Sequence, residues 1–405
     1  MEDWPVFWEW LSFAVRWLHV ITGIAWIGSS FYFIALDLGL RQRDGLPEGV
    51  HGEEWQVHGG GFYHIQKYLV APEQMPEHLI WFKWEAYATW LSGFALLAII
   101  YYVGADLYLV DPDVLQLSPS VAIVVSLLSI GLGWVIYDLL CKSPIGIDNN
   151  RLMVLLFVVL VAMAWGYTHV FSGRAAMLHL GAFAATIMSA NVFFIIIPNQ
   201  EKVVKSLKAG EHPDPALGMQ AKQRSTHNNY LTLPVLFLML SNHYPLAFAT
   251  EYNWVIAALV FLMGVLIRHY FNTKHARAGD ASFSLAAAGI LFTVIILLST
   301  LGARPGSEDE STSLNPSQQR FATSADFEKV RNTVQGRCAM CHAREPSWQG
   351  IAIAPNGVLL ESDTDIARNA RDIYIQAGRT TAMPPANVSQ MENTERRSIV
   401  RPTTG

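Results

Sequence analysis

The stretch Leu152-Met-Val-Leu-Leu-Phe-Val-Val-Leu-Val-Ala-Met-Ala-Trp-Gly-Tyr-Thr-His169-Val-Phe171 decides the fold class of this chain. It holds no Asp, Glu, Lys or Arg. Its length matches the roughly 20 residues that a helix needs to cross the hydrocarbon core of a bilayer. Seven further apolar runs have comparable lengths, near residues 10–36, 84–104, 119–140, 175–197, 230–249, 252–271 and 283–301. Together these runs predict an all-α, eight-helix transmembrane bundle over residues 1–302.

The composition agrees with a membrane protein. Of the 405 residues, 52% are apolar and only 15% are charged. So much apolar surface requires membrane lipid as a partner, and no basic stripe indicates binding to nucleic acid. The first apolar run follows Glu2 and Asp3, without a basic region before it or a small-residue cleavage site after it. We therefore expect it to remain as a membrane helix, since a removable signal peptide has both features.

The positions of Lys and Arg predict the orientation. The segments that follow the first, third, fifth and seventh runs are rich in these cations, whereas the segments on the other side, before the tail, carry only Arg174. The cation-rich set comprises Arg41, Arg43, Lys67, Lys83, Lys142, Arg151, Lys202, Lys205, Lys208, Lys222, Arg224, Arg268, Lys274 and Arg277. Cation-rich loops are cytoplasmic as a rule. Both termini are therefore predicted on the periplasmic side of a bacterial inner membrane.

The most specific motif lies in the tail, at Cys338-Ala-Met-Cys341-His342. Two thiols at this spacing can add to the vinyl groups of one haem, and the adjoining histidine can then ligate the iron. A zinc site or a redox pair is the competing interpretation. The only other cysteine is Cys141, so no second cysteine pair exists to complete a four-ligand zinc site. The motif predicts covalent haem c, with Cys338 and Cys341 as attachment points and His342 as iron ligand.

The rest of the tail is typical of a small class I cytochrome c. Residues 303–320 are rich in Pro, Gly, Ser and acidic residues, which predicts a flexible linker before a periplasmic domain over residues 321–405. Apolar residues at helical spacing precede both the haem motif and Met383, which is the predicted second iron ligand because Pro384 and Pro385 favour a loop there. The last helix, near 393–400, is short and poor in apolar residues, so loose packing is expected.

Four histidines fall in the outer half of the predicted bundle. They are His19, His169, His179 and His243, and Arg16 and Arg174 lie on the same side. Ionisable residues inside a membrane are costly and are candidates for function. Two imidazoles on facing helices can ligate a haem b, with either arginine neutralising its propionates. Alternatively, each histidine only donates a hydrogen bond across a helix interface.

A second polar group lies at the cytoplasmic ends of the runs. Its members are Glu85, His227, Asn228, Asn229 and His269. Amides beside an acid or an imidazole can hold a flat, polar heterocycle and take its proton. Alternatively, these side chains cap helices at the lipid headgroups. Between residues 37 and 81, the spacing of Phe62, Ile65 and Leu69 predicts a short surface helix, serving either as a lid or as an interfacial anchor.

Four stretches carry a family resemblance. They are Trp17-Leu-His19-Val-Ile-Thr-Gly-Ile-Ala-Trp-Ile-Gly28, Trp55-Gln-Val-His-Gly-Gly-Gly61, Lys83-Trp-Glu-Ala-Tyr-Ala-Thr-Trp-Leu-Ser-Gly93 and His227-Asn-Asn-Tyr-Leu-Thr-Leu-Pro234. With the tail motif, the chain resembles the bacterial membrane-bound urate oxidases fused to a C-terminal cytochrome c, the PuuD type. The resemblance covers nearly the whole length. It assigns no urate-binding residues.

The resemblance implies a function. Urate would be oxidised to 5-hydroxyisourate, and the electrons would leave through haem c to a respiratory-chain acceptor, either a soluble cytochrome c or a terminal oxidase. Dioxygen would not be reduced to hydrogen peroxide. Two other classes remain open on the residues alone. One is a quinol-linked electron relay without purine chemistry, and the other is a transporter with a redox-sensing tail.

Overall fold

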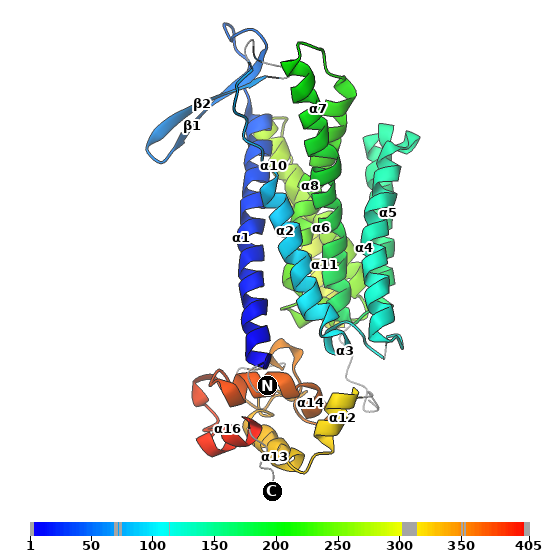
Figure 1. Ribbon diagram of the computed structural model, residues 1–405, viewed down its shortest axis with the longest axis vertical. Coiled ribbons are helices and arrows are strands. Elements are labelled where there is room, and N and C mark those ends of the chain that lie inside the picture. Colours follow the sequence, from blue (N-terminus) through cyan, green and yellow to red (C-terminus); the bar gives the residue numbers. More distant parts are fainter. Residues whose placement is uncertain are drawn as a thin grey trace.

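The computed structural model describes residues 4–68, 72, 75–112, 114–301, 314–349, 351 and 354–400. Long, nearly parallel helices form one part of the molecule, and a smaller helical tail lies at the end where α1 begins (Figure 1). The long helices are α1 (Trp4–Gly39), α2 (Trp84–Leu97), α4 (Pro119–Lys142), α5 (Asn149–Thr168), α6 (Gly173–Ala190), α7 (Ile197–Lys208), α8 (Pro215–Ser241), α10 (Asn253–Ala276) and α11 (Ser282–Leu301). Short elements between them are α3 (Ala105–Tyr108), η2 (Pro144–Ile147) and α9 (Pro245–Phe248).

Each predicted apolar run falls on one of these helices. Among the described residues, six helices are long and apolar enough to cross a membrane, by length and composition. The run at 84–104 continues from α2 into a π-helix, η1 (Ala98–Tyr102), and α6 and α7 are joined by a second π-helix, η3 (Asn191–Ile196). One boundary was predicted wrongly. Helix α8 begins at Pro215 because the Asp214 side chain caps its first turn, and it ends at Ser241.

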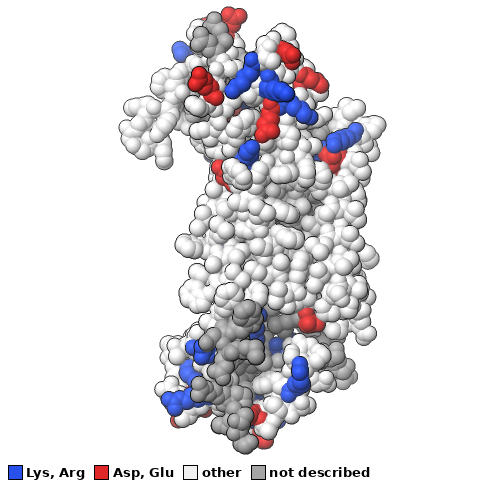
Figure 2. All heavy atoms as spheres, in the orientation of Figure 1, with Lys and Arg blue, Asp and Glu red and all other residues white. Residues whose placement is uncertain are grey.

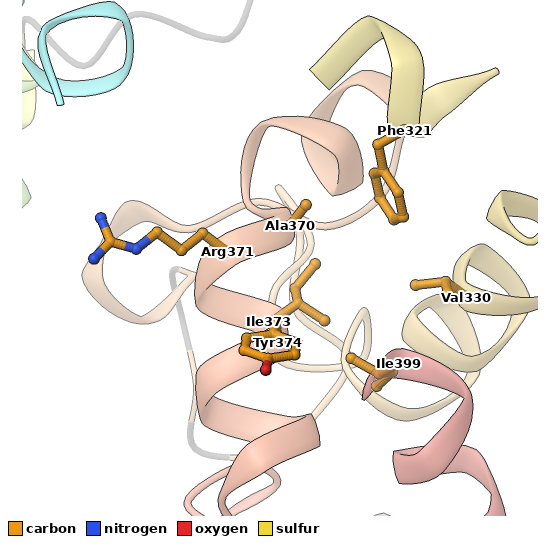
Figure 3. Close-up of a pocket in the computed structure, with 7 residues that line it drawn as sticks. All are labelled: Phe321, Val330, Ala370, Arg371, Ile373, Tyr374 and Ile399. Carbon is orange, nitrogen blue, oxygen red and sulfur yellow. The ribbon is translucent and has the colours of Figure 1, made fainter. Parts of the chain in front are cut away.

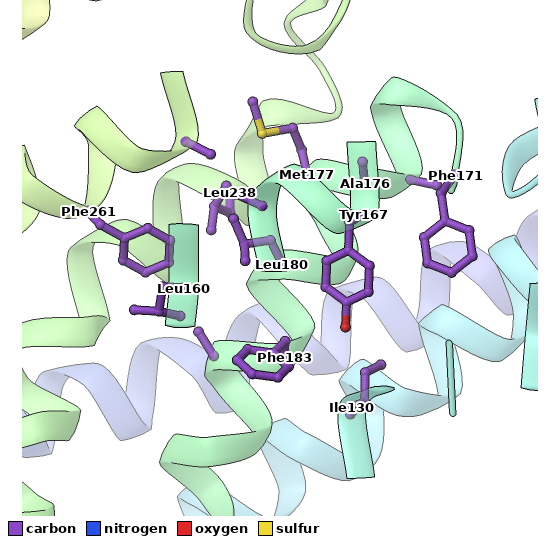
Figure 4. Close-up of a cluster of buried hydrophobic side chains, with 14 of the residues drawn as sticks. Ile130, Leu160, Tyr167, Phe171, Ala176, Met177, Leu180, Phe183, Leu238 and Phe261 are labelled. Atoms are coloured by element: carbon purple, nitrogen blue, oxygen red, sulfur yellow. The ribbon is translucent and has the colours of Figure 1, made fainter. Parts of the chain in front are cut away.

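The centre of the bundle is a close-packed apolar core. Figure 4 shows Phe171, Phe183 and Leu238 among its buried side chains. Helices α4 and α6 approach so closely that a Cβ atom at Gly133 would lie 2.0 Å from the ring of Phe183. Only glycine fits there, since real Cβ contacts are much longer. The core therefore fixes how α4 and α6 face each other.

The bundle surface is divided by charge. Figure 2 shows a broad band without Lys, Arg, Asp or Glu between two charged ends. A band of this kind is compatible with insertion into a membrane, in agreement with the long apolar helices. The tail and the start of α1 lie at the same end (Figure 1), as expected if both termini are on one side. The periplasmic location of this end stays a prediction.

The segment predicted as a surface helix is a β-hairpin, so that prediction was wrong. Strands β1 (Val50–His58) and β2 (Gly61–Tyr68) pair antiparallel, with His58 opposite Gly61. Gly59 and Gly60 both have positive φ, 59° and 82°, which a two-residue hairpin turn of this kind requires. The helical spacing of apolar residues was coincidental, and the glycine pair was the stronger signal. Apart from this hairpin and an isolated bridge between Arg41 and Glu53, the regular secondary structure of the described residues is helical.

The tail contains short helices around its own core. They are α12 (Pro316–Ala322), α13 (Phe327–Arg337), η4 (Pro355–Gly357), α14 (Asp363–Arg368), α15 (Ala370–Ile373), η5 (Tyr374–Arg379), η6 (Pro385–Asn387) and α16 (Asn393–Val400). The core includes Phe327, Val334 and Ile366. Helix α12 occupies part of the predicted linker, and residues 303–313 lie outside the described residues. The domain boundaries stay a prediction.

Candidate functional site

The haem motif lies in a tight turn directly after α13. The amide of His342 donates to the carbonyl of Cys338 at 3.0 Å. On the imidazole, Nδ1 lies 2.9 Å from the carbonyl oxygen of Val358, so Nδ1 must be the donor. This bond fixes the ring orientation and leaves Nε2 for a metal, the arrangement that ligating histidines usually have. The residues of the turn therefore fit a haem iron ligand.

The two thiols of the motif behave unlike a redox pair. Burial raises the pKa of Cys338 to about 11, and the neighbouring Cys341 adds to this effect. Burial also raises the pKa of the Cys341 thiol. Reactive C-x-x-C pairs have lowered thiol pKa values instead. Among the described residues, no group of three or more His, Cys, Asp or Glu side chains is placed to hold a metal ion.

Met383 lies on a loop at the edge of the tail core. Its side chain is partly buried against that core, and its amide donates to the carbonyl of Gln376 at 2.9 Å. Met391, the other methionine after the motif, is only 3% exposed and belongs to the core itself. Both methionines lie on loops, but Met383 is only partly buried, whereas the Met391 side chain is part of the core. Ligation of iron by Met383 stays a prediction.

The tail core contains an apolar cavity of about 320 Å³. Figure 3 shows Phe321, Val330 and Ile399 around it, whereas Arg371 points away. These three residues come from α12, α13 and α16. The buried part of α16 offers one large apolar side chain, Ile399, beside Arg396 and Ser398. The short last helix leaves this part of the core incompletely filled.

The first of the outer histidines, His19, lies on α1 against α2. Its Nδ1 is 3.0 Å from the carbonyl oxygen of Thr89 and 3.1 Å from the hydroxyl of Ser92. The ring packs on Gly93, where a Cβ atom would lie 2.8 Å from the imidazole. These contacts join two helices, as the packing interpretation expects. Both polar contacts involve Nδ1, so they do not occupy Nε2 of His19.

His179 is fully buried on α6. Its Nδ1 donates to the carbonyl of Ala175 at 2.7 Å, and its Nε2 has no hydrogen-bond partner. Ring centroids of Tyr101, Tyr167 and Phe171 lie 5.7, 5.9 and 4.7 Å from the imidazole. An unpaired buried nitrogen suits a ligand, but three aromatic rings crowd this imidazole. The surroundings of His179 do not fit a porphyrin in this arrangement.

The other two outer histidines lie elsewhere. His169 is exposed at the end of α5, where its Nδ1 lies 2.7 Å from the carbonyl oxygen of Trp165. His243 is exposed in the turn after α8. Arg16 is exposed, and Arg174 stacks on the ring of Phe248 at 5.4 Å. No described contact joins the four imidazoles to one another, although Arg16 and Arg174 lie near enough for their charges to act on His243. Haem b stays a prediction, which a pyridine haemochrome spectrum of the purified protein checks.

At the opposite end of the bundle, buried polar side chains form a network between α4, η3 and α8. The Tyr137 hydroxyl lies 2.7 Å from Nδ1 of His227. The Asn191 amide donates to the same hydroxyl and to Oδ1 of Asn228, both at 3.0 Å. Asn228 in turn donates to the carbonyl of Met188 at 2.9 Å. Two predicted residues, His227 and Asn228, thus belong to one network.

Arg224, which is only 3% exposed, adds a charged side chain to this network. Its Nη2 donates to Asp138 at 2.7 Å, and its guanidinium stacks over Tyr137 at 4.9 Å. Lys142 also donates to Asp138, at 2.6 Å. Nε and Nη1 of Arg224 and Oδ1 of Asn191 are buried without partners. Unpaired buried polar atoms are costly and need an explanation, such as a bound ligand or water.

Asn229 belongs to a neighbouring group on α8 and α10. It accepts a hydrogen bond from Nε of Arg268 at 2.6 Å and donates to Asn272 at 3.3 Å. The Arg268 guanidinium also lies 4.0 Å from the centre of the Phe31 ring on α1. A buried cation is thus held between three helices.

The remaining two predicted residues differ in their surroundings. Glu85 begins α2, and its Oε2 is buried without a partner. His269 is exposed, and its ring centroid lies 6.5 Å from that of Phe283. His269 therefore is not placed in the buried network.

Sequence reasoning missed most of the side chains in the polar network and its neighbouring group. The missed members are Tyr137, Asp138, Asn191, Arg224, Arg268 and Asn272. Arg224 and Arg268 were taken as loop cations, although both are buried in helices. One signal was available. Asp138 is an acid inside an apolar run, and such residues usually face a partner within the bundle.

The predicted cytoplasmic end has a second feature, a cavity of about 850 Å³ between β1 and the ends of α1 and α10. Glu53 lies in its wall and forms ion pairs with Arg43 and with His64. The Tyr32 hydroxyl donates to Gln56 at 2.6 Å across the same wall. The hairpin therefore closes one side of a hollow above the bundle.

Comparison with known families gives one result. The model of the family described as "Urate oxidase N-terminal" matches residues 5–299. No curated protein and no solved structure matched this chain. The matched range covers most of the chain and includes every helix from α1 to α10 and almost all of α11. The chain therefore belongs to the urate oxidase N-terminal family.

Proposed function

We propose that this protein is a membrane urate oxidase that converts urate to 5-hydroxyisourate and passes the electrons through haem c to a respiratory-chain acceptor. One observation carries the proposal. The chain that matches the urate oxidase family over residues 5–299 also holds a C-x-x-C-H motif, in which Val358 orients His342 for iron. A haem on the same chain supplies an electron acceptor other than dioxygen, so no hydrogen peroxide is formed.

The substrate site is proposed at the buried network of α4, η3 and α8. Urate is a flat anion whose edge alternates N–H donors and carbonyl acceptors. Two nitrogens of Arg224 and the side-chain carbonyl oxygen of Asn191 have no hydrogen-bond partner, and both side chains contact Tyr137. A cation and an amide are the groups that would bind such an edge. His227, which also contacts Tyr137, is the proposed proton acceptor.

The reaction balances as a dehydrogenation. Urate and one water give 5-hydroxyisourate, two protons and two electrons. A haem c held by His342 would accept one electron at a time, so each urate would require two transfers with reoxidation between them. Because the network and the tail lie at opposite ends of the bundle, an intermediate carrier such as the predicted haem b would have to bridge them. The protons are proposed to leave by way of His227. Arg224 binds the substrate anion.

An anaerobic absorption spectrum before and after urate addition tests the proposal. We expect reduced c-type bands to grow with urate in the purified protein. The control is the double variant Cys338→Ala, Cys341→Ala, which cannot attach haem and should show no such bands. Reduction by a quinol but not by urate would instead support the relay, and the absence of any change with urate would refute urate oxidation through haem c.

A further inference from the structure

The last helix of the tail contributes a buried arginine to the loop that carries Met383. Arg396 on α16 is only 7% exposed. Its Nη1 donates to the carbonyl oxygens of Ala377 and Met383, both at 2.8 Å. Its Nη2 donates to Oδ1 of Asn387 at 3.3 Å. One guanidinium therefore contacts the chain before, at and after the methionine.

The loop needs an external support of this kind. Pro384 and Pro385 follow Met383 and have no N–H groups, so the backbone there cannot form a regular hydrogen-bond ladder. The amide of Met383 donates to Gln376, which fixes only its N-terminal side. The carbonyl of Met383 is fixed by Arg396. A planar guanidinium can satisfy several acceptors at once, which the single ammonium of a lysine cannot do with the same geometry.

Arg396 also explains how α16, although polar, packs against the rest of the tail. Helix α16 buries Arg396, Ser398 and Ile399, and its neighbour Arg337 on α13 binds Glu395 at 3.0 Å. The helix is thus anchored by hydrogen bonds more than by apolar contact. Loss of the Arg396 side chain would leave buried carbonyl oxygens unpaired, which is costly.

We infer that Arg396 is a positioning residue that holds the Met383 thioether in place as the sixth ligand of haem c. The inference rests on the proposed function, since it requires haem at His342. Arg396 acts from behind the ligand, through the main chain, and does not touch the iron. Such supporting contacts commonly tune metal ligation strongly.

The test compares Arg396→Gln, Arg396→Lys and the matched control Arg397→Gln, in the full-length protein. Arg397 is the next residue on the same helix and is exposed. Two readouts report on Met383 alone. One is the weak long-wavelength absorption band of ferric haem with a methionine ligand, and the other is the affinity for added imidazole, which must displace that methionine.

We expect Arg396→Gln to lose most of the band and to bind imidazole at least tenfold more tightly, whereas Arg397→Gln matches the wild type. Arg396→Lys should change both readouts in the same direction by a smaller factor. An intact band and wild-type imidazole affinity in Arg396→Gln would overturn the inference. If that variant does not retain haem, Arg396→Lys decides by the same criteria. A wild-type protein without covalent haem, by pyridine haemochrome, would instead refute the proposed function.

Discussion

At the scale of single residues, Arg224 is the most informative side chain of the bundle. It pairs with Asp138, while two of its nitrogens, Nε and Nη1, are buried without a hydrogen-bond partner. In a purely structural buried ion pair, the remaining donors of the arginine also have hydrogen-bond partners, because a buried charge without them is costly. The unpaired donors favour a role in binding an anion. Stability and binding can be separated by experiment, because Asp138 can be neutralised independently.

The first prediction concerns Arg224→Met. This change leaves the buried Asp138 carboxylate with only Lys142 as a partner, so the free energy of unfolding should fall by about 3 kcal/mol. Adding Asp138→Asn should restore most of this loss, since no buried charge then remains unpaired and Lys142 is 56% exposed. Neither variant should reduce haem c with urate. Thermal unfolding in detergent and anaerobic spectra are the two measurements.

The control for that prediction is Arg151→Met on α5. Arg151 also pairs with an aspartate, Asp148 at 3.1 Å, but its side chain is 81% exposed. Exposed pairs contribute roughly 0–1 kcal/mol, so little stability should be lost and the urate response should persist. Urate-dependent reduction at the wild-type rate in the Arg224→Met, Asp138→Asn protein would exclude Arg224 from substrate binding.

At the scale of elements, the hairpin is held by one carboxylate. Hydrogen bonds from His64 and from Arg43 hold the pKa of Glu53 below its usual range. A lowered folded-state pKa means that Glu53 stabilises the hairpin at pH values above its pKa in the unfolded chain. This stabilisation is lost as the pH falls through the folded-state pKa. The hairpin should therefore loosen in acid before the bundle does.

The second prediction follows from the lowered pKa of Glu53. Amide hydrogen exchange in residues 50–68 should accelerate, relative to the intrinsic rate, as the pH is lowered below about 4. Glu53→Gln removes the titrating group, so its exchange should be faster at neutral pH and nearly independent of pH. Residues 119–142 in α4 serve as the internal reference. Equal acid sensitivity of the wild type and Glu53→Gln would show that another group controls the hairpin.

The helices could largely be predicted from the sequence, whereas the contacts between them could not. Apolar runs such as 152–171 predict helices well, because a bilayer-length run without charge has few other structures available. The haem motif predicted His342 as an iron ligand, and the hydrogen bond from its Nδ1 to Val358 fits that prediction. The partners of His227 could not be predicted in the same way. Tyr137 and Asn191 are far from it in sequence, and only the packing of three helices brings them together.

At the scale of the whole molecule, the tail contacts the bundle through an exposed ion pair. Arg371 on α15 donates to Glu9 on α1 at 3.2 Å. The side chains are 41% and 48% exposed, so the pair contributes roughly 0–1 kcal/mol. Such a contact orients the tail without fixing it. The distance from the bundle to the haem motif thus depends on a weak, salt-sensitive interaction.

The third prediction concerns this pair. Glu9→Lys or Arg371→Glu should slow urate-dependent reduction of haem c severalfold at low salt, because like charges then face each other. The double variant with both changes restores an attractive pair and should recover the rate. At about 1 M salt, where the Debye length is about 3 Å, all four proteins should react alike. Stopped-flow spectra measure the rates, and a double variant as slow as the singles would refute the orienting role.

The π-helix between α6 and α7 has one further consequence, for evolutionary comparison. A π-turn holds one residue more than an α-turn, and each α-helical residue rotates the chain by about 100°. Deleting one residue within Asn191–Ile196 would convert the segment to α-helix and turn either α6 or α7 away from its present partners. A relative with an α-helix here would be one residue shorter at this point. When such a relative is aligned with this chain, the one-residue gap belongs within this segment. Only then does Asn191 align with the residue of the relative that faces the equivalent of Tyr137.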